Sequence, residues 1–429
     1  MEKSEITRLL NAPTAAERIA GLRRVKAELD AGHIPAPEKT SFVNNHIHTT
    51  FSFSPYSPTL AVWLSFENGL QSSGLMDHDS IAGANEFLEA GKTLNFPVTI
   101  GVECRTDFSD TRLNGRLINH PDQFSTAYSA IHGIPHGRLD DVATFFAPCI
   151  RIRNDRNARM TAKLNEYLKE FGLSLDFEKD VLPLSQSANG GAVTERHLLY
   201  ALALRLIAQF GRSAELVSLI EKRFGIPHSE KLRKQLLDDK NPFYAYDLLG
   251  ALKGAFTPHF YIPAREECLP VRTVAAFSHD IGAIFAYAYL GDVTDSVTGD
   301  KLAQRFEDAY LDLLFDELPK LGFQAVTYMP ARNTVAQLQR VQALCAQHNL
   351  LQISGEDINS PRQLFRCEAL KKPEYRHLVD ATWALIGHEL SATANPNNGF
   401  FTPETVRRFP SLADRINHFA AIARAERKL

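Results

Sequence analysis

The sequence predicts an α/β protein: a distorted barrel of seven strands with an inserted helical subdomain. Short apolar, β-prone runs alternate with amphipathic helical runs over residues 41–140, and the alternation resumes over 271–357. Residues 141–269 between these two stretches are mostly helical in pattern. Alternating β and α segments are typical of a parallel sheet or barrel, and barrels accept insertions in their loops because loop extension costs little.

We divide the chain into five segments on this pattern. They are a helical lead-in (1–38), a first part of the barrel (39–140), an inserted helical subdomain (141–269), a second part of the barrel (270–390) and a C-terminal loop and helix (391–429).

The expected elements follow from apolar spacing and from breaks at proline and glycine. In the lead-in, helical spacing over 4–31 is interrupted by Pro13. The seven expected strands cover residues 42–48, 74–76, 97–102, 125–131, 271–277, 322–328 and 350–354. Helices are expected at 60–69, 81–91, 301–318, 334–347 and 411–428, and in the insert at 159–171, 195–210 and 214–224.

Composition and charge exclude several classes of protein. The formal net charge of −3 and the lack of a basic tract argue against a long nucleic acid as partner. Five scattered cysteines form neither a disulfide pattern nor a CxxC zinc pattern, which indicates a reducing compartment. No apolar run is long enough to cross a bilayer, and the N-terminus lacks a basic-then-apolar signal pattern. We therefore expect a cytoplasmic protein without a membrane partner, and its oligomeric state stays open.

Polar residues suited to metal binding follow nearly every expected strand. His46 and His48 are two residues apart at the end of the first strand, so both imidazoles point to one side. The other residues of this kind are Asp77, His78, Glu103, His132, His279 and Asp357. In a parallel barrel the carboxyl ends of the strands open onto one face, where these residues would meet and hold two or three cations.

On these residues the chain resembles the polymerase and histidinol phosphatase (PHP) superfamily of metal-dependent phosphoesterases. The motifs are His46-Ile-His48, Gly74-Leu-Met-Asp-His78-Asp-Ser, Gly101-Val-Glu103, His279 after an apolar run, and Ser354-Gly-Glu-Asp357. Two segments of the insert are also similar, Arg156 to Leu168 and Thr194-Glu-Arg-His197. The likeness is spread over residues 40–360 and implies a distorted seven-stranded barrel.

The resemblance also implies a ligand set. A first divalent ion (Zn, Mn or Fe) would be held by His46, His48, Glu103 and Asp357. Glu103 would bridge to a second ion held by His132 and His279, with His136 as the alternative to His132.

A third ion in such proteins takes three ligands, of which only His78 is present. The other two places hold Phe53, or Ser54, and Asn359. The third ion would therefore be absent, weakly bound, or held with the help of Asp77 or Asp79.

Two cations a few ångströms apart would activate water for attack on a phosphate ester and neutralise the phosphoryl oxygens. For catalysis we expect Glu103, Asp77 and His197. For binding the substrate we expect Arg159, Arg196 and Arg332, since arginine suits bidentate contact with phosphate. Arg159 follows Arg153 and Arg156 at intervals of three residues, which would place the three on one side of a helix.

The sequence thus predicts a metal-dependent phosphoric ester hydrolase that acts on a small phosphorylated metabolite of the nucleotide or sugar phosphate class. Three alternatives remain. One is a nuclease acting on nucleic-acid ends, another is a non-catalytic PHP-like domain, and the third is a metal-dependent hydrolase of non-phosphate bonds.

Overall fold

The computed structural model describes residues 1–226, 229–293 and 305–426. Its centre is a sheet whose strands follow the order β1-β2-β3-β4-β6-β7-β8, with a short strand β5 paired to β3 outside this order. The strands are β1 Val43–Ile47, β2 Ser72–His78, β3 Val98–Asp107, β4 Thr126–His132, β5 Leu269–Pro270, β6 Ile284–Ala288, β7 Ala325–Tyr328 and β8 Leu351–Ser354. A bridge between Ile47 and Ile358 joins the two ends, so the sheet is a nearly closed barrel of seven strands, as predicted.

One strand distorts the barrel. β4 runs antiparallel to both of its neighbours, β3 and β6, while the other pairs along the barrel are parallel. The prediction of parallel strands throughout was therefore wrong at β4. Its carboxyl end lies beside the first residue of β6, Ile284, and not beside the carboxyl ends of the parallel strands.

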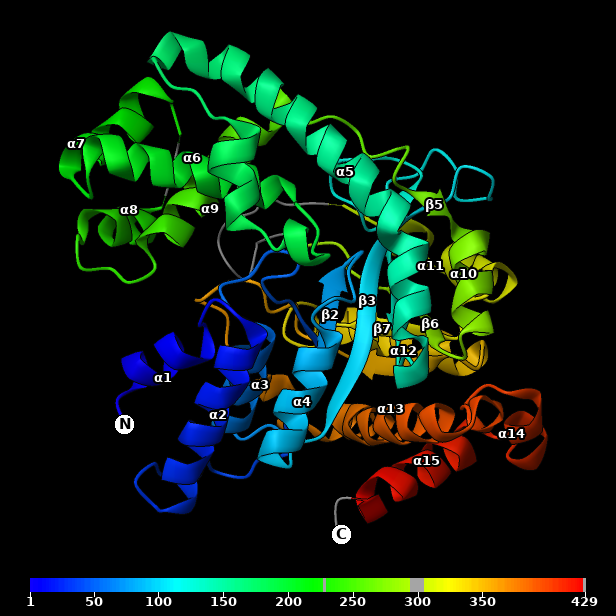
Figure 1. The fold of residues 1–429 in the computed structure, drawn as a ribbon. Helices are drawn as coiled ribbons and strands as arrows, with labels where there is room; N and C mark the ends of the chain where they lie inside the picture. Colours follow the sequence, from blue (N-terminus) through cyan, green and yellow to red (C-terminus); the bar gives the residue numbers. More distant parts are fainter. Residues whose placement is uncertain (227–228, 294–304, 427–429) are drawn as a thin grey trace.

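The helices cover the barrel from several sides (Figure 1). They are α1 Lys3–Leu10, α2 Ala15–Asp30, α3 Pro58–Glu67, α4 Ala84–Leu94, α5 Leu139–Leu168, α6 Glu195–Phe210, α7 Ala214–Ser218, α8 Glu230–Leu237, α9 Tyr244–Phe260, α10 Val271–Asp280, α11 Leu311–Glu317, α12 Val335–Gln347, α13 Arg376–Ala394, α14 Pro403–Arg408 and α15 Leu412–Glu426. The part of the predicted helix 301–318 that precedes residue 305 lies outside the described residues. No helix in the described ranges is long and apolar enough to span a membrane.

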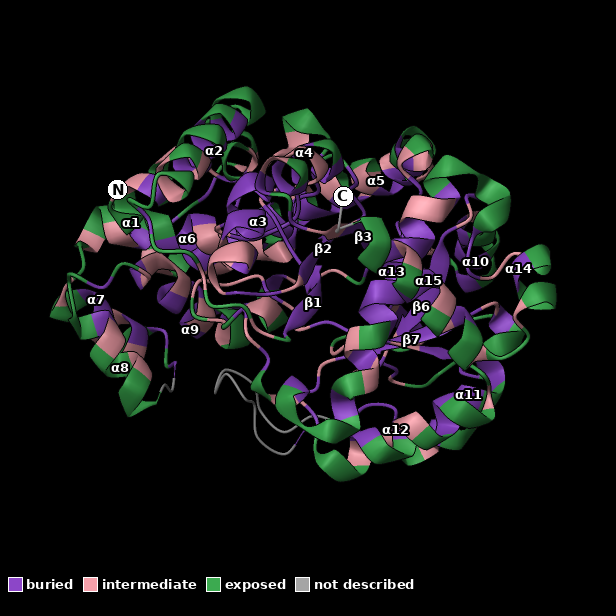
Figure 2. Cartoon of the chain, turned by 90° about the horizontal axis from the view of Figure 1, so that it is seen from below, coloured by how far each residue is buried: buried purple, intermediate pink, exposed green. Residues whose placement is uncertain are grey.

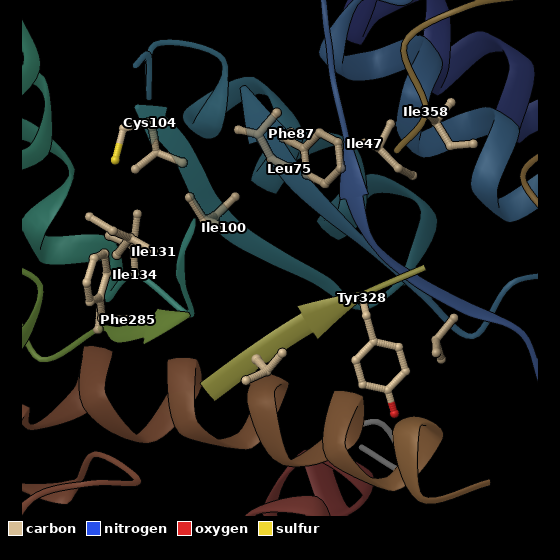
Figure 3. Packing of buried hydrophobic residues seen from close by; sticks show 14 of the residues in the cluster. Ile47, Leu75, Phe87, Ile100, Cys104, Ile131, Ile134, Phe285, Tyr328 and Ile358 are labelled. Atoms are coloured by element: carbon tan, nitrogen blue, oxygen red, sulfur yellow. The ribbon is translucent and has the colours of Figure 1, made fainter. Parts of the chain in front are cut away.

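Alternating side chains of the strands build two apolar layers. Outward-facing Leu75 and Ile100 pack with Phe87 of α4 between sheet and helices (Figure 3). Inward-facing Met76 and Ile284 fill the barrel together with small alanines, and residues of α13 complete this cluster. Figure 2 shows the result: buried strands inside and helices whose outer faces are exposed. The sequence analysis did not predict α13, although this helix packs against the barrel.

The helices between β4 and β5 have a hydrophobic cluster of their own, which includes Leu164, Leu202 and Leu252. In Figure 1 they lie on the side to which β2 and β3 point, whereas α13 and α15 lie on the opposite side. The carboxyl ends of these strands are therefore directed toward the inserted helices.

One predicted strand is a helix. Residues 271–277 belong to α10, and the strand that takes the expected place in the barrel is β6. Val271, Val274 and Ala275 are buried at intervals of three and four residues, which is the spacing of one helix face. The short apolar run fitted both patterns, and the helical reading was the correct one.

Candidate metal centre

Two histidines and a glutamate meet at one end of the barrel. His46 in β1 and His48 just after it point to the same side, as residues two apart in a strand do. The parallel pairing of β2 and β3 sets Glu103 opposite His78. His46, His48 and Glu103 are all buried, and each offers a ligand atom within 4.8 Å of the others.

The distances within this metal cluster, defined as His46, His48 and Glu103, are short. The Nε2 atoms of the two histidines are 3.2 Å apart. Oε2 of Glu103 lies 3.7 Å from Nε2 of His46 and 3.8 Å from Nε2 of His48. His78 adds its Nδ1 at 3.1 Å from the same carboxylate oxygen.

Asp357 reaches the cluster because the barrel closes beside it. The amide of Ile358 donates to the carbonyl of His46, and the amide of His48 donates to the carbonyl of Ile358. This pairing brings Oδ1 of Asp357 to 3.3 Å from Nε2 of His48. Five of the predicted ligands, His46, His48, His78, Glu103 and Asp357, are thus brought together.

The pKa values of His48 and His78 are shifted in opposite directions. Burial alone would lower the pKa of His48, but the hydrogen bond and charge of Asp357 outweigh it, so the pKa is raised. Burial, followed by the positive charges of His48 and Arg153, holds the pKa of His78 well below its ordinary value. His78 is therefore neutral at physiological pH.

Asp77, predicted as a catalytic residue, does not contact the metal cluster directly. Its buried carboxylate accepts hydrogen bonds from the amide and hydroxyl of Thr49 and from the hydroxyl of Ser52. These contacts fix the loop that follows β1. Burial, the leading influence, raises the pKa of Asp77 despite these bonds.

His279 was predicted as a metal ligand, and this prediction was wrong. It lies on α10, is exposed, and its Nε2 is 2.9 Å from the carbonyl oxygen of Gly322. The cause is the misassigned strand 271–277, since a residue at the end of α10 does not face the barrel interior.

His132 lies inside the barrel, in register with Gly101 and Ile284, because β4 is antiparallel. It is not part of the metal cluster. Its buried Nε2 has no hydrogen-bond partner among the residues that the structure describes, and burial lowers its pKa to about 3. A ligand role for His132 stays a prediction. The alternative, His136, instead pairs with Glu389 of α13 at 2.7 Å.

His197 and Arg159 have other surroundings than predicted. Nδ1 of His197 accepts a hydrogen bond from the amide of Thr194, and its ring packs edge-on against Phe53, so it caps and packs the start of α6. Arg159 is exposed on α5, whereas Arg153 is buried. Each step of three residues rotates 60° backward around a helix, so the third arginine has left the buried side.

Arg196 lies in the first turn of α6, and Arg332 lies in the turn between β7 and α12. Arg196 donates to Asn359, whose amide donates to Asp357 at 2.6 Å, and its guanidinium lies over the ring of Phe53. It is thus linked to the edge of the metal cluster. Nε of Arg332 donates to the carbonyl of Leu290, and its substrate role stays a prediction.

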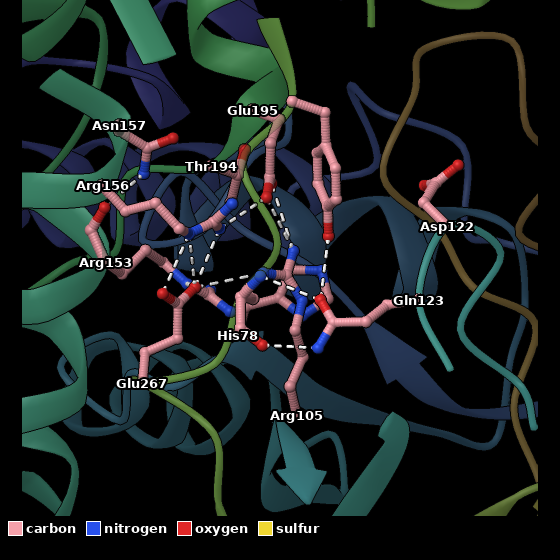
Figure 4. Close-up of polar contacts among 12 residues, drawn as sticks. His78, Arg105, Asp122, Gln123, Arg153, Arg156, Asn157, Thr194, Glu195 and Glu267 are labelled. Carbon is pink, nitrogen blue, oxygen red and sulfur yellow. Dashed lines mark hydrogen bonds and ion pairs between the residues drawn. The ribbon is translucent and has the colours of Figure 1, made fainter. Parts of the chain in front are cut away.

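A buried ionic network adjoins His78, and sequence reasoning identified only part of it (Figure 4). The network, defined by its five members, consists of Arg105, Arg153, Arg156, Glu195 and Glu267, whose ion pairs measure 2.6 to 3.6 Å. Arg153 also pairs with Asp79 at 2.7 Å. Asp79 is one of the residues expected to help hold a third ion, and this ion pair engages its carboxylate. Arg105 lies two residues after Glu103 on β3, so both side chains are on the same side of the strand. This spacing could have identified Arg105 from the sequence.

Comparison with known proteins leaves the family open. No family model and no curated protein sequence matches the chain. A candidate metal-dependent phosphoesterase from Bifidobacterium adolescentis is 18% identical, with a TM-score of 0.49 over 77% of this chain and 94% of that one. An amidohydrolase from Chromobacterium violaceum, with bound sulfate and no metal, is 14% identical, with a TM-score of 0.48 over 75% and 88%.

At these scores the two structures carry no argument about activity. The distorted barrel and the cluster of His46, His48 and Glu103, which the resemblance to the PHP superfamily implies, are nevertheless both present in the chain itself.

Proposed function

We propose that this protein is a metal-dependent hydrolase that releases phosphate from a small phosphorylated metabolite of the nucleotide or sugar phosphate class. The observation that carries the proposal is the buried metal cluster of His46, His48 and Glu103, flanked by His78 and Asp357. The proposal includes two or three divalent ions at this site.

The donor set fits a divalent transition metal. Imidazole nitrogens and carboxylate oxygens together suit zinc, manganese or iron. Two imidazole nitrogens that face each other at 3.2 Å need a proton or a cation between their lone pairs, and Glu103 supplies negative charge at the same point. When bound, such ions supply Lewis-acid activation of water and neutralise charge on the phosphoryl group.

The residues of the chain have separate tasks in this proposal. Glu103 lies at the centre, where His46, His48 and His78 all approach the same carboxylate oxygen. His78 flanks this carboxylate, with its Nδ1 3.1 Å from the shared oxygen. Glu103 is therefore the residue whose loss should affect metal binding most.

Arg196 is the proposed contact for the anionic group of the substrate. Its guanidinium is held by Asn359 on one side and by the ring of Phe53, 4.8 Å away, on the other. Asn359 in turn contacts Asp357, so the positive charge lies beside the metal cluster. Guanidinium groups bind phosphate oxygens in a bidentate manner, which favours a phosphate ester as substrate.

The test combines metal analysis with a substrate panel. Purified protein is stripped with a chelator and reloaded with Zn²⁺, Mn²⁺ or Fe²⁺, and bound metal per chain is measured by elemental analysis. Phosphate release is then measured on mononucleotides, sugar phosphates and a single-stranded oligonucleotide. We expect activity on the small phosphoesters that is insensitive to salt.

Two variants make the test specific. Glu103→Gln keeps the shape of the side chain but loses its charge, so it should lose bound metal and phosphate release. His279→Gln, at the exposed end of α10, should keep both. A wild-type protein that holds no divalent metal and releases phosphate from none of these compounds would refute the proposal.

A further inference from the structure

The hydroxyl of Ser52 lies between the carboxylate of Asp77 and the imidazole of His48. Its Oγ is 2.6 Å from Oδ1 of Asp77 and 3.2 Å from Nδ1 of His48. All three residues are buried, Ser52 completely. A chain of hydrogen bonds therefore leads from strand β2 to the metal cluster.

The donor and the acceptor of each of these hydrogen bonds follow from counting the available hydrogens. Oδ1 of Asp77 also accepts the amide hydrogen of Thr49, and Oδ2 accepts the Thr49 hydroxyl, each at 2.6 Å. A carboxylate only accepts, so Ser52 donates its single hydrogen to Asp77. The oxygen of Ser52 then accepts from His48, and the hydrogen of the neutral imidazole must sit on Nδ1.

The other nitrogen of the same ring faces the metal cluster. Nε2 of His48 lies 3.2 Å from Nε2 of His46 and 3.3 Å from Oδ1 of Asp357. In the protonated ring Nε2 also carries a hydrogen, which Asp357 accepts, but in the neutral ring the hydrogen is on Nδ1 and the lone pair is on Nε2. The tautomer that Ser52 selects is thus the one that can bind a cation at this point.

We propose that Asp77, acting through Ser52, is a positioning residue that fixes the Nδ1-protonated tautomer of His48 and so presents Nε2 to the metal. This inference rests on the proposed function, because it takes His48 as a metal ligand. It also gives Asp77 a role in place of the direct catalytic one expected from the sequence.

The test compares two serine variants of the loop after β1. Ser52→Ala removes the acceptor for His48. Ser54→Ala is the matched control, because Ser54 is also buried but, within the described part of the chain, its hydroxyl has one hydrogen bond, accepted from the amide of Tyr56. Both variants are checked by circular dichroism and thermal unfolding, so that a folding defect is recognised.

Two quantities are measured on each protein. The dissociation constant for Zn²⁺ is determined by competition with a chelator, and we expect it to rise about 10- to 100-fold in Ser52→Ala and to stay unchanged in Ser54→Ala. The tautomer of His48 is read from side-chain ¹⁵N NMR of the metal-free protein at pH 9. We expect hydrogen on Nδ1 in the wild type and in Ser54→Ala, and a shift toward Nε2 in Ser52→Ala.

The outcomes separate this inference from the proposed function. A wild-type His48 with its hydrogen on Nε2, or an unchanged Zn²⁺ affinity in folded Ser52→Ala, overturns the inference. If Ser52→Ala does not fold, the wild-type NMR result decides alone. A wild-type protein that binds no divalent metal refutes the proposed function, and its His48 tautomer can still be read.

Discussion

His388 is a buried histidine whose two ring nitrogens have different partners. Nδ1 accepts a hydrogen bond from the amide of Phe400, and Nε2 lies 3.1 Å from the carbonyl oxygen of Gly133. The ring is therefore neutral with its hydrogen on Nε2. Protonation of Nδ1 would set one N–H against another, and burial lowers the pKa of His388 from 6.5 to about 4.

This geometry predicts a loss of stability in acid. Between pH 6.5 and about 4 the unfolded chain binds a proton at His388 that the folded chain does not bind, so the free energy of unfolding falls as the pH falls. The contribution of this group is about 3 kcal/mol over that window. Above pH 6.5 it contributes no pH dependence.

The measurement is urea unfolding at several pH values in wild type and in His388→Gln, whose amide can accept from Phe400 and donate to Gly133. The variant should show a slope smaller by up to about 1.4 kcal/mol per pH unit between pH 6 and 5. Identical slopes would show that His388 does not titrate as described.

The residues of the metal cluster were predictable where local spacing decides their direction. His46 and His48 are two apart in a strand, and Glu103 follows a clear apolar run. The roles of Asp77, Ser52 and the buried ionic network were not predictable in this way, because they depend on contacts between distant segments. Glu267, for example, meets Arg105 across 162 positions of sequence.

At the scale of elements, α13 and α15 pack with their backbones almost in contact at Gly387. A Cβ atom on Gly387 would lie 1.9 Å from the carbonyl oxygen of Phe419, closer than any real contact. α13 also packs against the barrel, where Ala384 and Leu385 join the interior cluster. A shift of this helix would therefore disturb the barrel as well.

Gly387→Ala should destabilise the protein, because the added methyl group must push α15 away. We expect a loss of about 1–3 kcal/mol or more, which outweighs the gain of roughly 1 kcal/mol in helix propensity. The free energy of unfolding in urea measures this change.

Gly254→Ala in α9 is the matched control, since a Cβ atom there meets nothing within 4 Å. This substitution should stabilise by about 0.5–1 kcal/mol. Equal effects of the two substitutions would contradict the described packing of α13 on α15.

Element prediction succeeded where pattern and length agreed. The helices at 15–30 and 335–347 begin at Thr14 and Thr334, each of which forms a capping box that is visible in the sequence. It failed at α10, where a seven-residue apolar run fitted both strand and helix. It also failed for the direction of β4, because pairing with β3 and β6 is not encoded in the pattern of β4 itself.

At the scale of the whole molecule, the buried ionic network connects the barrel to the inserted helices. Arg105 belongs to β3, Arg153 and Arg156 to α5, and Glu195 to α6, while Glu267 precedes β5. The side chain of Glu267 is 1% exposed and contacts all three arginines. Together with Glu195 and Asp79 it balances the three positive charges within the protein.

Glu267→Gln should be strongly destabilising, because it leaves a buried positive charge uncompensated. Loss of one partner of a buried ion pair costs about 3–5 kcal/mol. Urea unfolding measures this cost, and hydrogen exchange should show faster opening of α5 and α6.

Asp312→Asn provides the comparison. Its pair with Arg340 is 3.0 Å long, within the range of the Glu267 pairs, but both of its side chains are largely exposed. We expect a change below about 0.5 kcal/mol for this surface pair. A small effect of Glu267→Gln would show that the inserted helices are held to the barrel by their other contacts.

The bridge between Ile47 and Ile358 pairs two positions that lie far apart in the chain. During synthesis one edge of β1 has no neighbour until more than three hundred further residues have been made. Contacts between such distant positions form slowly, and an open strand edge invites pairing with another molecule in the meantime. In newly made protein this edge of β1 should therefore stay open to such pairing until residue 358 has left the ribosome.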